Sequence, residues 1–337
     1  MRDSAAPTPP SFPSLVQHYF TDYLVAQRSV SARTVASYRD AITLFIDFVS
    51  NRLRKTPTSL LLTDITPEQI LAFLDHLERD RHNVVRSRNL RLTALRAFLK
   101  YAGRRDVTAL QSVERALAVP MKRFERPILN FLTRAEMLTV LGQPGTSWAS
   151  QRDHLLLAML YNTGARVSEI IGVRAADVVL DGAACVHLHG KGRKDRSVPL
   201  WKTTVHEIRA WLRLNPTLRG EAPLLPNRDG GTMTRCNVNQ RLALAVASAI
   251  SQQPALASKR VSPHTIRHST AMHLLQSGVP FNVIALWLGH ESTNTTHRYV
   301  EADLAMKEKA LARLDPPDTK LRRFRASDSL MKFLQTL

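Results

Sequence analysis

The sequence predicts a mainly α-helical fold with a small β-sheet, divided into two domains. Apolar residues recur at three- and four-residue steps through most of the 337 residues, as on the buried face of a helix. Short runs within 178–200 alternate apolar and polar residues instead, which is typical of strands. The stretch 118–131 contains Pro120 and Pro127 and follows neither pattern, so it predicts a linker between the domains.

The first domain is predicted to be helical over 14–102. Ser31 is suited to cap a helix whose apolar face carries Val35, Tyr38, Ile42, Phe45, Ile46 and Val49. Pro67 is suited to the first turn of the next helix, and a further helix is expected to end at Gly103.

The second domain mixes helices and strands. Strands are expected at 178–180, 185–188 and 197–200. Helices are expected at 134–141, 150–162, from about 166, and at 203–214, 236–250, 264–277, 281–288 and 303–313. The predicted order along the chain is a disordered arm (1–12), the helical domain (13–117), the linker (118–131), the mixed domain (132–315) and a tail (316–337).

The charge balance indicates a polyanionic partner. Lys and Arg number 47 against 28 Asp and Glu, a net charge of +19, and both domains share the excess. Nucleic acid fits such a charge. A membrane partner is disfavoured because no run approaches the roughly 20 apolar residues that span a bilayer. Two cysteines without a CxxC motif predict a cytoplasmic protein with reduced thiols.

One segment is a candidate DNA-binding face. Nine basic residues and one acid lie between Arg79 and Arg105, and helical spacing places several of them on one side. A solvated helix face is the alternative, but this density of charge favours contact with phosphates. The DNA-binding candidates are Arg86, Asn89, Thr93, Arg96, Lys100, Lys122, Arg123 and Lys194.

Two stretches offer cations for phosphate chemistry. In TGARVSE (163–169), Arg166 begins a helix, and Glu169 lies where it can hold the guanidinium. A simple intrahelical ion pair is the alternative. In HGKGRKDRSVPL (189–200), a lysine at the tip of a hairpin can donate a proton. Either Lys191 or Lys194 fits this role.

Two later stretches add imidazoles and a phenol. In PHTIRHSTAMH (263–273), His264 and Arg267 share a helical face, and His268 lies four residues after His264. A metal site of the HxxxH kind is disfavoured because Arg267 would place a positive charge beside the ion. LGHESTNTTHRYV (288–300) contains His290 and Tyr299, and Tyr299 is the candidate nucleophile.

Taken in this order, these motifs resemble the tyrosine recombinase (phage integrase) family. The resemblance covers about 132–313 through TGARVSE, GKGRK, HTIRH, LGH and the TTxxY pattern, and it extends more loosely to the helical half. It implies a SAM-like core-binding domain followed by a catalytic domain. The implied catalytic residues are Arg166, Lys191, His264, Arg267, His290 and the nucleophile Tyr299, supported by Glu169 and His268.

The resemblance also implies an activity. A site-specific DNA recombinase of the integrase or transposase type would cut and rejoin double-stranded DNA through a 3′-phosphotyrosine, with no metal, ATP or other cofactor. A tetramer on DNA is expected, with the tail docking on a neighbouring protomer, in the nucleoid of a prokaryotic cytoplasm. The length and the tail favour a mobile element over chromosome-dimer resolution. A type IB topoisomerase-like enzyme and a catalytically silent DNA-binding regulator are the alternatives, and a metal-dependent nuclease is disfavoured.

Overall fold

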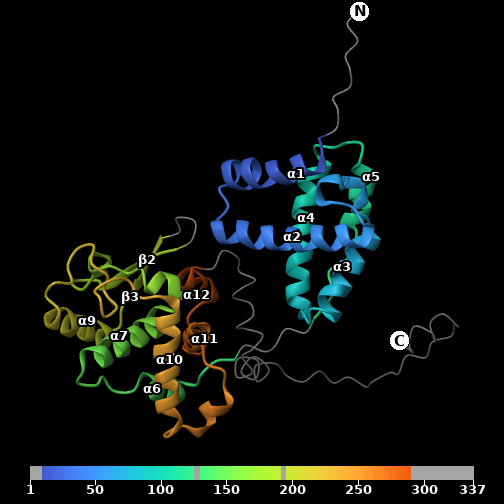
Figure 1. Ribbon diagram of the computed structural model, residues 1–337. Coiled ribbons are helices and arrows are strands. Elements are labelled where there is room, and N and C mark those ends of the chain that lie inside the picture. The colour runs from blue at the N-terminus through green and yellow to red at the C-terminus, as the bar shows by residue number, and fades with distance from the viewer. Residues whose placement is uncertain (1–9, 125–129, 191–194, 290–337) are drawn as a thin grey trace, which may run out of the picture. The chain divides into compact units, whose positions relative to one another are not determined.

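The computed structural model divides into two compact units, Met1–Arg126 and Pro127–Leu337, and describes residues 10–124, 130–190 and 195–289 (Figure 1). The division falls inside the predicted linker. The predicted mainly α-helical fold with a small sheet is confirmed. Of the helices in the described ranges, none has the length and apolar character needed to cross a bilayer.

The first unit is entirely helical in its described part. Its elements are α1 (Phe12–His18), a π-helical stretch (Tyr19–Gln27), α2 (Ala32–Leu53), two 3-10 turns (Pro57–Ser59 and Leu62–Asp64), α3 (Pro67–Arg79), α4 (Val85–Gly103) and α5 (Leu110–Leu117). Aromatic rings fill its core: Tyr19 meets Phe98 at 5.4 Å and Phe45 meets Phe73 at 5.2 Å between ring centroids, both edge to face. These contacts join α4 to the amino end of the unit and α2 to α3.

Local capping explains where these helices begin. The Ser31 hydroxyl accepts a hydrogen bond from the Thr34 amide, and Pro67 is the first residue of α3, both as predicted. The helix α5 was not predicted from the sequence. Its start signal is Asp106, whose Oδ1 accepts from the amides of Thr108 and Ala109 at 3.0 and 3.3 Å just before the helix begins.

The second unit surrounds α7 with helices and places a sheet at one side. Its elements are α6 (Arg134–Leu141), α7 (Trp148–Thr163), α8 (Val167–Ile170), a 3-10 turn (Ala175–Asp177), β1 (Val178–Val179), β2 (Cys185–His189), β3 (Asp195–Pro199), α9 (Lys202–Leu214), α10 (Arg235–Ile250), a 3-10 turn (Pro254–Ser258), α11 (Pro263–Gln276) and α12 (Phe281–Leu288). Helices α6, α9 and α11 pack against α7 (Figure 1), and the short α8 does so too. The predicted helix at 303–313 lies outside the described residues.

The sheet is antiparallel in the order β1-β2-β3. Cys185 of β2 pairs with Pro199 of β3, and His189 pairs with Asp195 at the other end of the ladder. Val186 and Val198 are fully buried while their neighbours along each strand are not, because side chains alternate between the two faces. One face of the hairpin therefore belongs to the core, which fixes its register.

A glycine turn after α7 allows two distant helices to approach. Gly164 has φ of 58° and ends α7 in the left-handed conformation that glycine adopts at no steric cost. A Cβ at this position would lie 2.5 Å from Cδ2 of Leu288. The carboxyl ends of α7 and α12 therefore meet only because residue 164 has no side chain.

Replacing Gly164 with alanine should lower the free energy of unfolding of the second unit by about 2–4 kcal/mol, the sum of left-handed strain and overpacking against Leu288. The fluorescence of the four tryptophans during urea unfolding measures this, because all four lie beyond residue 127. Gly182→Ala is the matched control: φ is 67° but nothing lies within 4 Å of an added Cβ. It should lose only about 1 kcal/mol, and equal losses would contradict the role of Leu288.

Candidate active site

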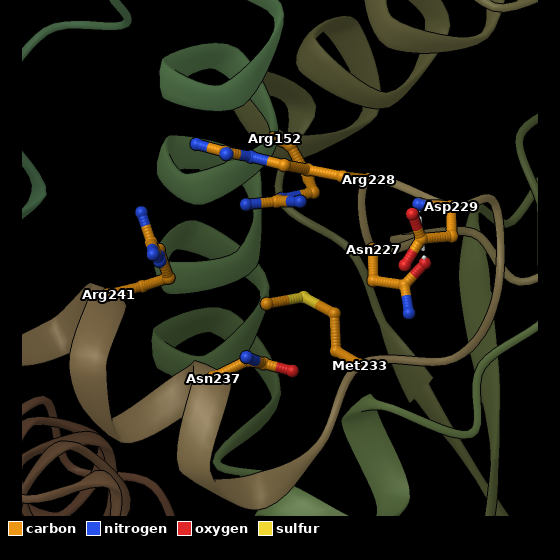
Figure 2. A pocket seen from close by; sticks show the side chains of 7 residues that line it. All are labelled: Arg152, Asn227, Arg228, Asp229, Met233, Asn237 and Arg241. Atoms are coloured by element: carbon orange, nitrogen blue, oxygen red, sulfur yellow. Dashed lines mark hydrogen bonds between the residues drawn. The ribbon is translucent and has the colours of Figure 1, made fainter.

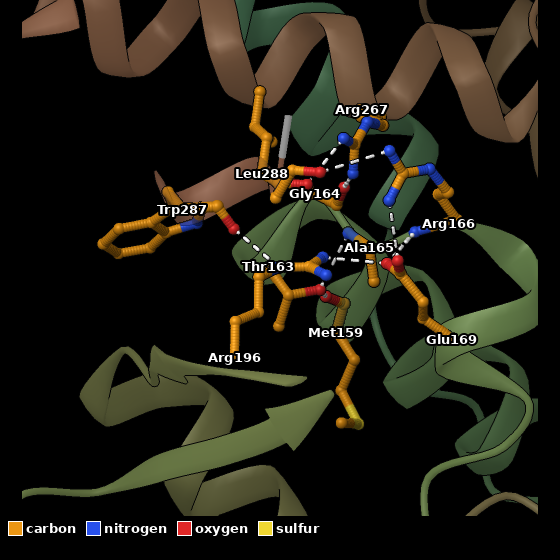
Figure 3. Close-up of polar contacts among 11 residues, drawn as sticks. Met159, Thr163, Gly164, Ala165, Arg166, Glu169, Arg196, Arg267, Trp287 and Leu288 are labelled. Atoms are coloured by element: carbon orange, nitrogen blue, oxygen red, sulfur yellow. Dashed lines mark hydrogen bonds and ion pairs between the residues drawn. The ribbon is translucent and has the colours of Figure 1, made fainter. Parts of the chain in front are cut away.

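The turn between α7 and α8 positions the first arginine. The Thr163 hydroxyl donates to the Met159 carbonyl at 2.7 Å and accepts from the Ala165 amide at 3.1 Å, so it bridges the last turn of α7 to the residues after it (Figure 3). Arg166 follows as the residue that caps α8. Its backbone is thus fixed from both sides, while its side chain is 41% exposed.

Glu169 holds Arg166 through both backbone and side chain. The Arg166 amide donates to Oε2 of Glu169, and Nη1 donates to Oε1, each at 2.8 Å. The Glu169 side chain is only 2% exposed. Burial alone would raise its pKa, but hydrogen bonds from Arg196 and Arg166 outweigh this and lower the pKa to about 2. Glu169 is therefore an ionised, buried anchor.

The second arginine lies beneath this turn. Arg267 of α11 is 4% exposed; its Nη1 donates to the Gly164 carbonyl at 2.5 Å, and its Nη2 donates to the Leu288 carbonyl at 2.7 Å. Nη2 of Arg166 donates to the next carbonyl, that of Gly289, at 3.3 Å. Two segments far apart in sequence therefore converge on the end of α12 (Figure 3).

A third arginine, Arg196, was not singled out from the sequence. Its Nη2 donates to Oε2 of Glu169 at 2.8 Å, and its Nε donates to the Trp287 carbonyl at 2.9 Å. Three consecutive carbonyls, those of Trp287, Leu288 and Gly289, thus accept from three different arginines. One signal could have found it: Arg196 lies two residues before the buried Val198, on the strand face that packs inward.

His264 stands at the start of α11 with an exposed side chain, one turn before Arg267. Partial desolvation, followed by the charges of Arg267, Arg166 and Arg235, lowers the pKa of its imidazole below 6.5. His264 is therefore neutral at pH 7 and can accept a proton. His268 is half-buried on the same helix. Within the described ranges, no three His, Cys, Asp or Glu side chains gather closely enough to hold a metal ion.

A separate polar pocket of about 350 Å³ lies at the amino end of α7 (Figure 2). Arg152, Arg228 and Arg241 line it. The buried Arg152 donates to Asp153 at 2.6 Å and to the Pro226 carbonyl at 3.1 Å, so it connects α7 to the segment between α9 and α10. The same Asp153 lies 3.7 Å from Arg241. Arg152 and Arg241 therefore have structural roles within the second unit, and we do not assign this pocket to the active site.

Residues 130–306 match the Phage integrase family, and residues 18–106 match the N-terminal SAM-like domain of phage integrases. The first match spans more than half of the chain. The chain belongs to the phage integrase family.

Relatives of known name agree with this assignment. The chain is 42% identical over 328 residues to the integrase/recombinase y4rC of Sinorhizobium fredii, and the match covers 97% of this chain and 98% of that protein. It is 31% identical over 293 residues to tyrosine recombinase XerC of Neisseria gonorrhoeae, covering 85% and 91%. The chain is therefore an enzyme of site-specific recombination of the tyrosine type.

A solved structure shares the fold. The XerH site-specific recombinase bound to a palindromic difH substrate, in a post-cleavage complex, matches with a TM-score of 0.67. The match covers 85% of this chain and 81% of that chain at 18% identity. At this identity the likeness shows a common architecture, with the SAM-like and catalytic parts in the same order.

Several predicted site residues of the recombinase lie outside the described residues. They are Lys191, Lys194, His290 and Tyr299. The other tyrosine of the second unit, Tyr161, is described: its hydroxyl lies 2.8 Å from Nδ1 of the buried His273, and burial raises its pKa. A raised pKa disfavours the phenolate, so Tyr161 is poorly suited to nucleophilic attack.

Two of the predicted DNA-binding residues on α4 contact segments of the first unit beyond this helix. Nη2 of Arg96 donates to the carbonyls of Leu117 and Val119 at 2.8 and 2.9 Å, which satisfies the end of α5. Asn89 exchanges hydrogen bonds with the backbone of Lys122. These contacts give both side chains a role in folding, and their contact with DNA stays a prediction.

The remaining described candidates are exposed: Arg86, Thr93, Lys100, Lys122 and Arg123. The Thr93 hydroxyl donates to the Asn89 carbonyl at 2.9 Å, and the Lys122 ammonium lies 2.6 Å from Glu78. Arg86, Lys100 and Arg123 can reach a phosphate without breaking such contacts.

Replacing Glu169 with glutamine should destabilise the recombinase at pH 7 by on the order of 3 kcal/mol, because the shift from 4.5 to about 2 stabilises the folded state. A lowered carboxyl pKa contributes stability above the unfolded value of 4.5 and loses it as pH falls towards 2. Urea unfolding of both proteins should therefore converge across this window. Glu221→Gln, which removes a carboxylate that is 79% exposed, should unfold like wild type at every pH; a pH-independent loss in Glu169→Gln would contradict the linkage.

Proposed function

We propose that the recombinase cuts one strand of a specific DNA site with Tyr299, forms a covalent 3′-phosphotyrosine, and rejoins the strand without metal or ATP. One observation carries the proposal. Arg166 and Arg267, from separate elements, converge on the turn that precedes His290, and both charges act on His264. Such a cluster is suited to an anionic, phosphorus-centred transition state.

The two arginines have different roles in this proposal. A phosphodiester under attack gathers negative charge on its non-bridging oxygens. The buried Arg267 supplies a fixed positive charge, since its Nη atoms are held by carbonyls. Arg166 is 41% exposed, and its planar fork can bind two phosphate oxygens. Together they supply the charge that a metal ion supplies in other phosphoryl-transfer enzymes.

Proton transfer accompanies the exchange of bonds. The Tyr299 oxygen forms a bond to phosphorus while the bond to the 5′ oxygen of the next nucleotide breaks. His264, neutral at pH 7 because its pKa is lowered, accepts the phenol proton. Lys191 donates a proton to the departing 5′ oxygen, with Lys194 the alternative donor, and His290 donates a hydrogen bond to the phosphate.

Rejoining is the reverse reaction on a new partner. The free 5′ hydroxyl of another strand attacks the phosphotyrosine and releases Tyr299. The covalent intermediate conserves the phosphodiester bond, so no nucleotide cofactor is needed.

In this proposal the substrate is double-stranded DNA, and an assembly of several protomers binds it. Basic residues lie in both units, which suits contact with a duplex from two sides. The assembly is a tetramer on two sites, with the tail 316–337 of one protomer docked on the next. We place the recombinase in a prokaryotic cytoplasm on the nucleoid, as the enzyme of a mobile element.

Tyr299→Phe should abolish covalent attachment to DNA. The measurement uses nicked duplexes drawn from the DNA that flanks the gene, incubated with protein in EDTA and resolved on a denaturing gel. Wild type should give a protein–DNA band, and the variant should bind the same duplex without giving one. Tyr161→Phe is the matched control and should keep the band. A band that survives in Tyr299→Phe would overturn the assignment of the nucleophile.

Lys100→Ala should weaken DNA binding by removing one phosphate contact. The slope of log K against log salt concentration should become shallower by about 0.9. Arg115→Ala is the control: this exposed guanidinium lies 4.0 Å from Glu68 on another helix and should leave the slope unchanged. Fluorescence anisotropy over a salt series measures both. An unchanged slope in Lys100→Ala would remove this residue from the DNA-binding face.

A further inference from the structure

We infer that Arg196 is a positioning residue for DNA cleavage, acting through Glu169 and the carboxyl end of α12. This inference rests on the proposed function, because it concerns the rate at which Tyr299 attacks. Arg196 is 11% exposed, so it is placed to organise other residues rather than to meet the DNA itself.

One guanidinium joins three elements of the second unit. From β3, Arg196 directs Nη2 to Glu169 at the start of α8 and Nε to the Trp287 carbonyl at the end of α12 (Figure 3). Because the guanidinium is planar and rigid, satisfying both acceptors fixes the distance between them. The strand β3 also begins directly after 191–194, the stretch with both candidate lysines. Arg196 thus connects the segments that carry the proposed catalytic groups.

Arg196 also sets the net charge around Arg166. The Glu169 carboxylate accepts hydrogen bonds from both arginines, so the trio carries a net charge of +1. Without Arg196, Arg166 and Glu169 would form a neutral pair, and a phosphate arriving at Arg166 would meet a weaker field. The desolvated carboxylate makes this difference larger than it would be in water.

The turn after α12 packs closely against the Arg196 side chain. Gly289 has φ of 63°, and a Cβ there would lie 3.1 Å from Nη1 of Arg196. The carbonyl of Gly289 accepts from Arg166, and its neighbour in sequence is His290. Loss of Arg196 would therefore release the Trp287 carbonyl and leave a space beside the turn that Arg166 grips.

The test is a double-substitution cycle on cleavage. Wild type, Arg196→Gln, Glu169→Gln and the double variant are compared for the single-turnover rate of adduct formation and for the Kd of the same nicked duplex. We expect Arg196→Gln to lower the rate of adduct formation by about tenfold to a hundredfold, the range typical of residues that orient a functional group through hydrogen bonds. The Kd should be unchanged. The rate loss in the double variant should be smaller than the product of the two single losses, because both changes remove the shared Arg196–Glu169 interaction. Arg209→Gln, which removes a surface arginine bound to Asp181, should match wild type.

Comparing rate with affinity separates positioning from a general loss of structure. A positioning role lowers the adduct rate at saturating DNA while the Kd stays that of wild type. A merely structural role would reduce the folded fraction, so DNA binding would weaken as the rate falls. Arg196→Lys keeps the charge but cannot span both acceptors, so it should cleave more slowly than wild type and faster than Arg196→Gln. This variant also decides the matter if Arg196→Gln does not fold.

Three results would overturn the inference: a wild-type rate in Arg196→Lys or Arg196→Gln, rate losses that multiply in the double variant, or a Kd that rises as much as the rate falls. The proposed function is judged separately in the same gel. Absence of a Tyr299-dependent adduct in wild type would overturn it, and the inference with it, whereas a normal adduct with an indifferent Arg196 would overturn the inference alone.

Discussion

The carboxyl end of α12 is the point on which the described part of the catalytic unit depends. A helix leaves its last carbonyl oxygens without partners inside the helix, and the partial negative charge there attracts cations. In this recombinase, three successive carbonyls accept from arginines of β3, α11 and the turn before α8. A buried guanidinium such as Arg267 cannot be left without acceptors except at high cost. Hydrogen bonds from charged side chains therefore join α7, α11, α12 and the sheet, in addition to apolar packing.

The cluster also brings like charges together, which folding must tolerate. Glu169 is the carboxylate that Arg166 and Arg196 share, and their hydrogen bonds and charges lower its pKa. Because two arginines share one carboxylate, this group of three side chains keeps a net positive charge. The net charge of +19 is a property of the whole chain. The charge available to the proposed chemistry depends instead on the two arginines that share one glutamate.

Much of the fold was legible in the sequence because its signals are local. Ser31 and Pro67 start helices where predicted, and α6 and α12 span the predicted residues. Arg166 and Glu169 were paired correctly because they lie three residues apart. Arg196 was missed because its partners lie 27 and 91 residues away. Arg96 was assigned to DNA alone because helical spacing cannot reveal that the end of α5 lies beside it.

Arg166 and Arg267 are held by carbonyls and by Glu169, that is, by groups of the protein itself. In water, charges around a phosphate must reorient their solvent shells whenever the charge distribution changes. Here the guanidiniums are held in place by the fold, so under the proposed mechanism little reorganisation would accompany the reaction. Folding the chain already includes the free-energy cost of bringing the arginines together and ordering their side chains. This cost therefore does not add to the barrier of each proposed strand exchange.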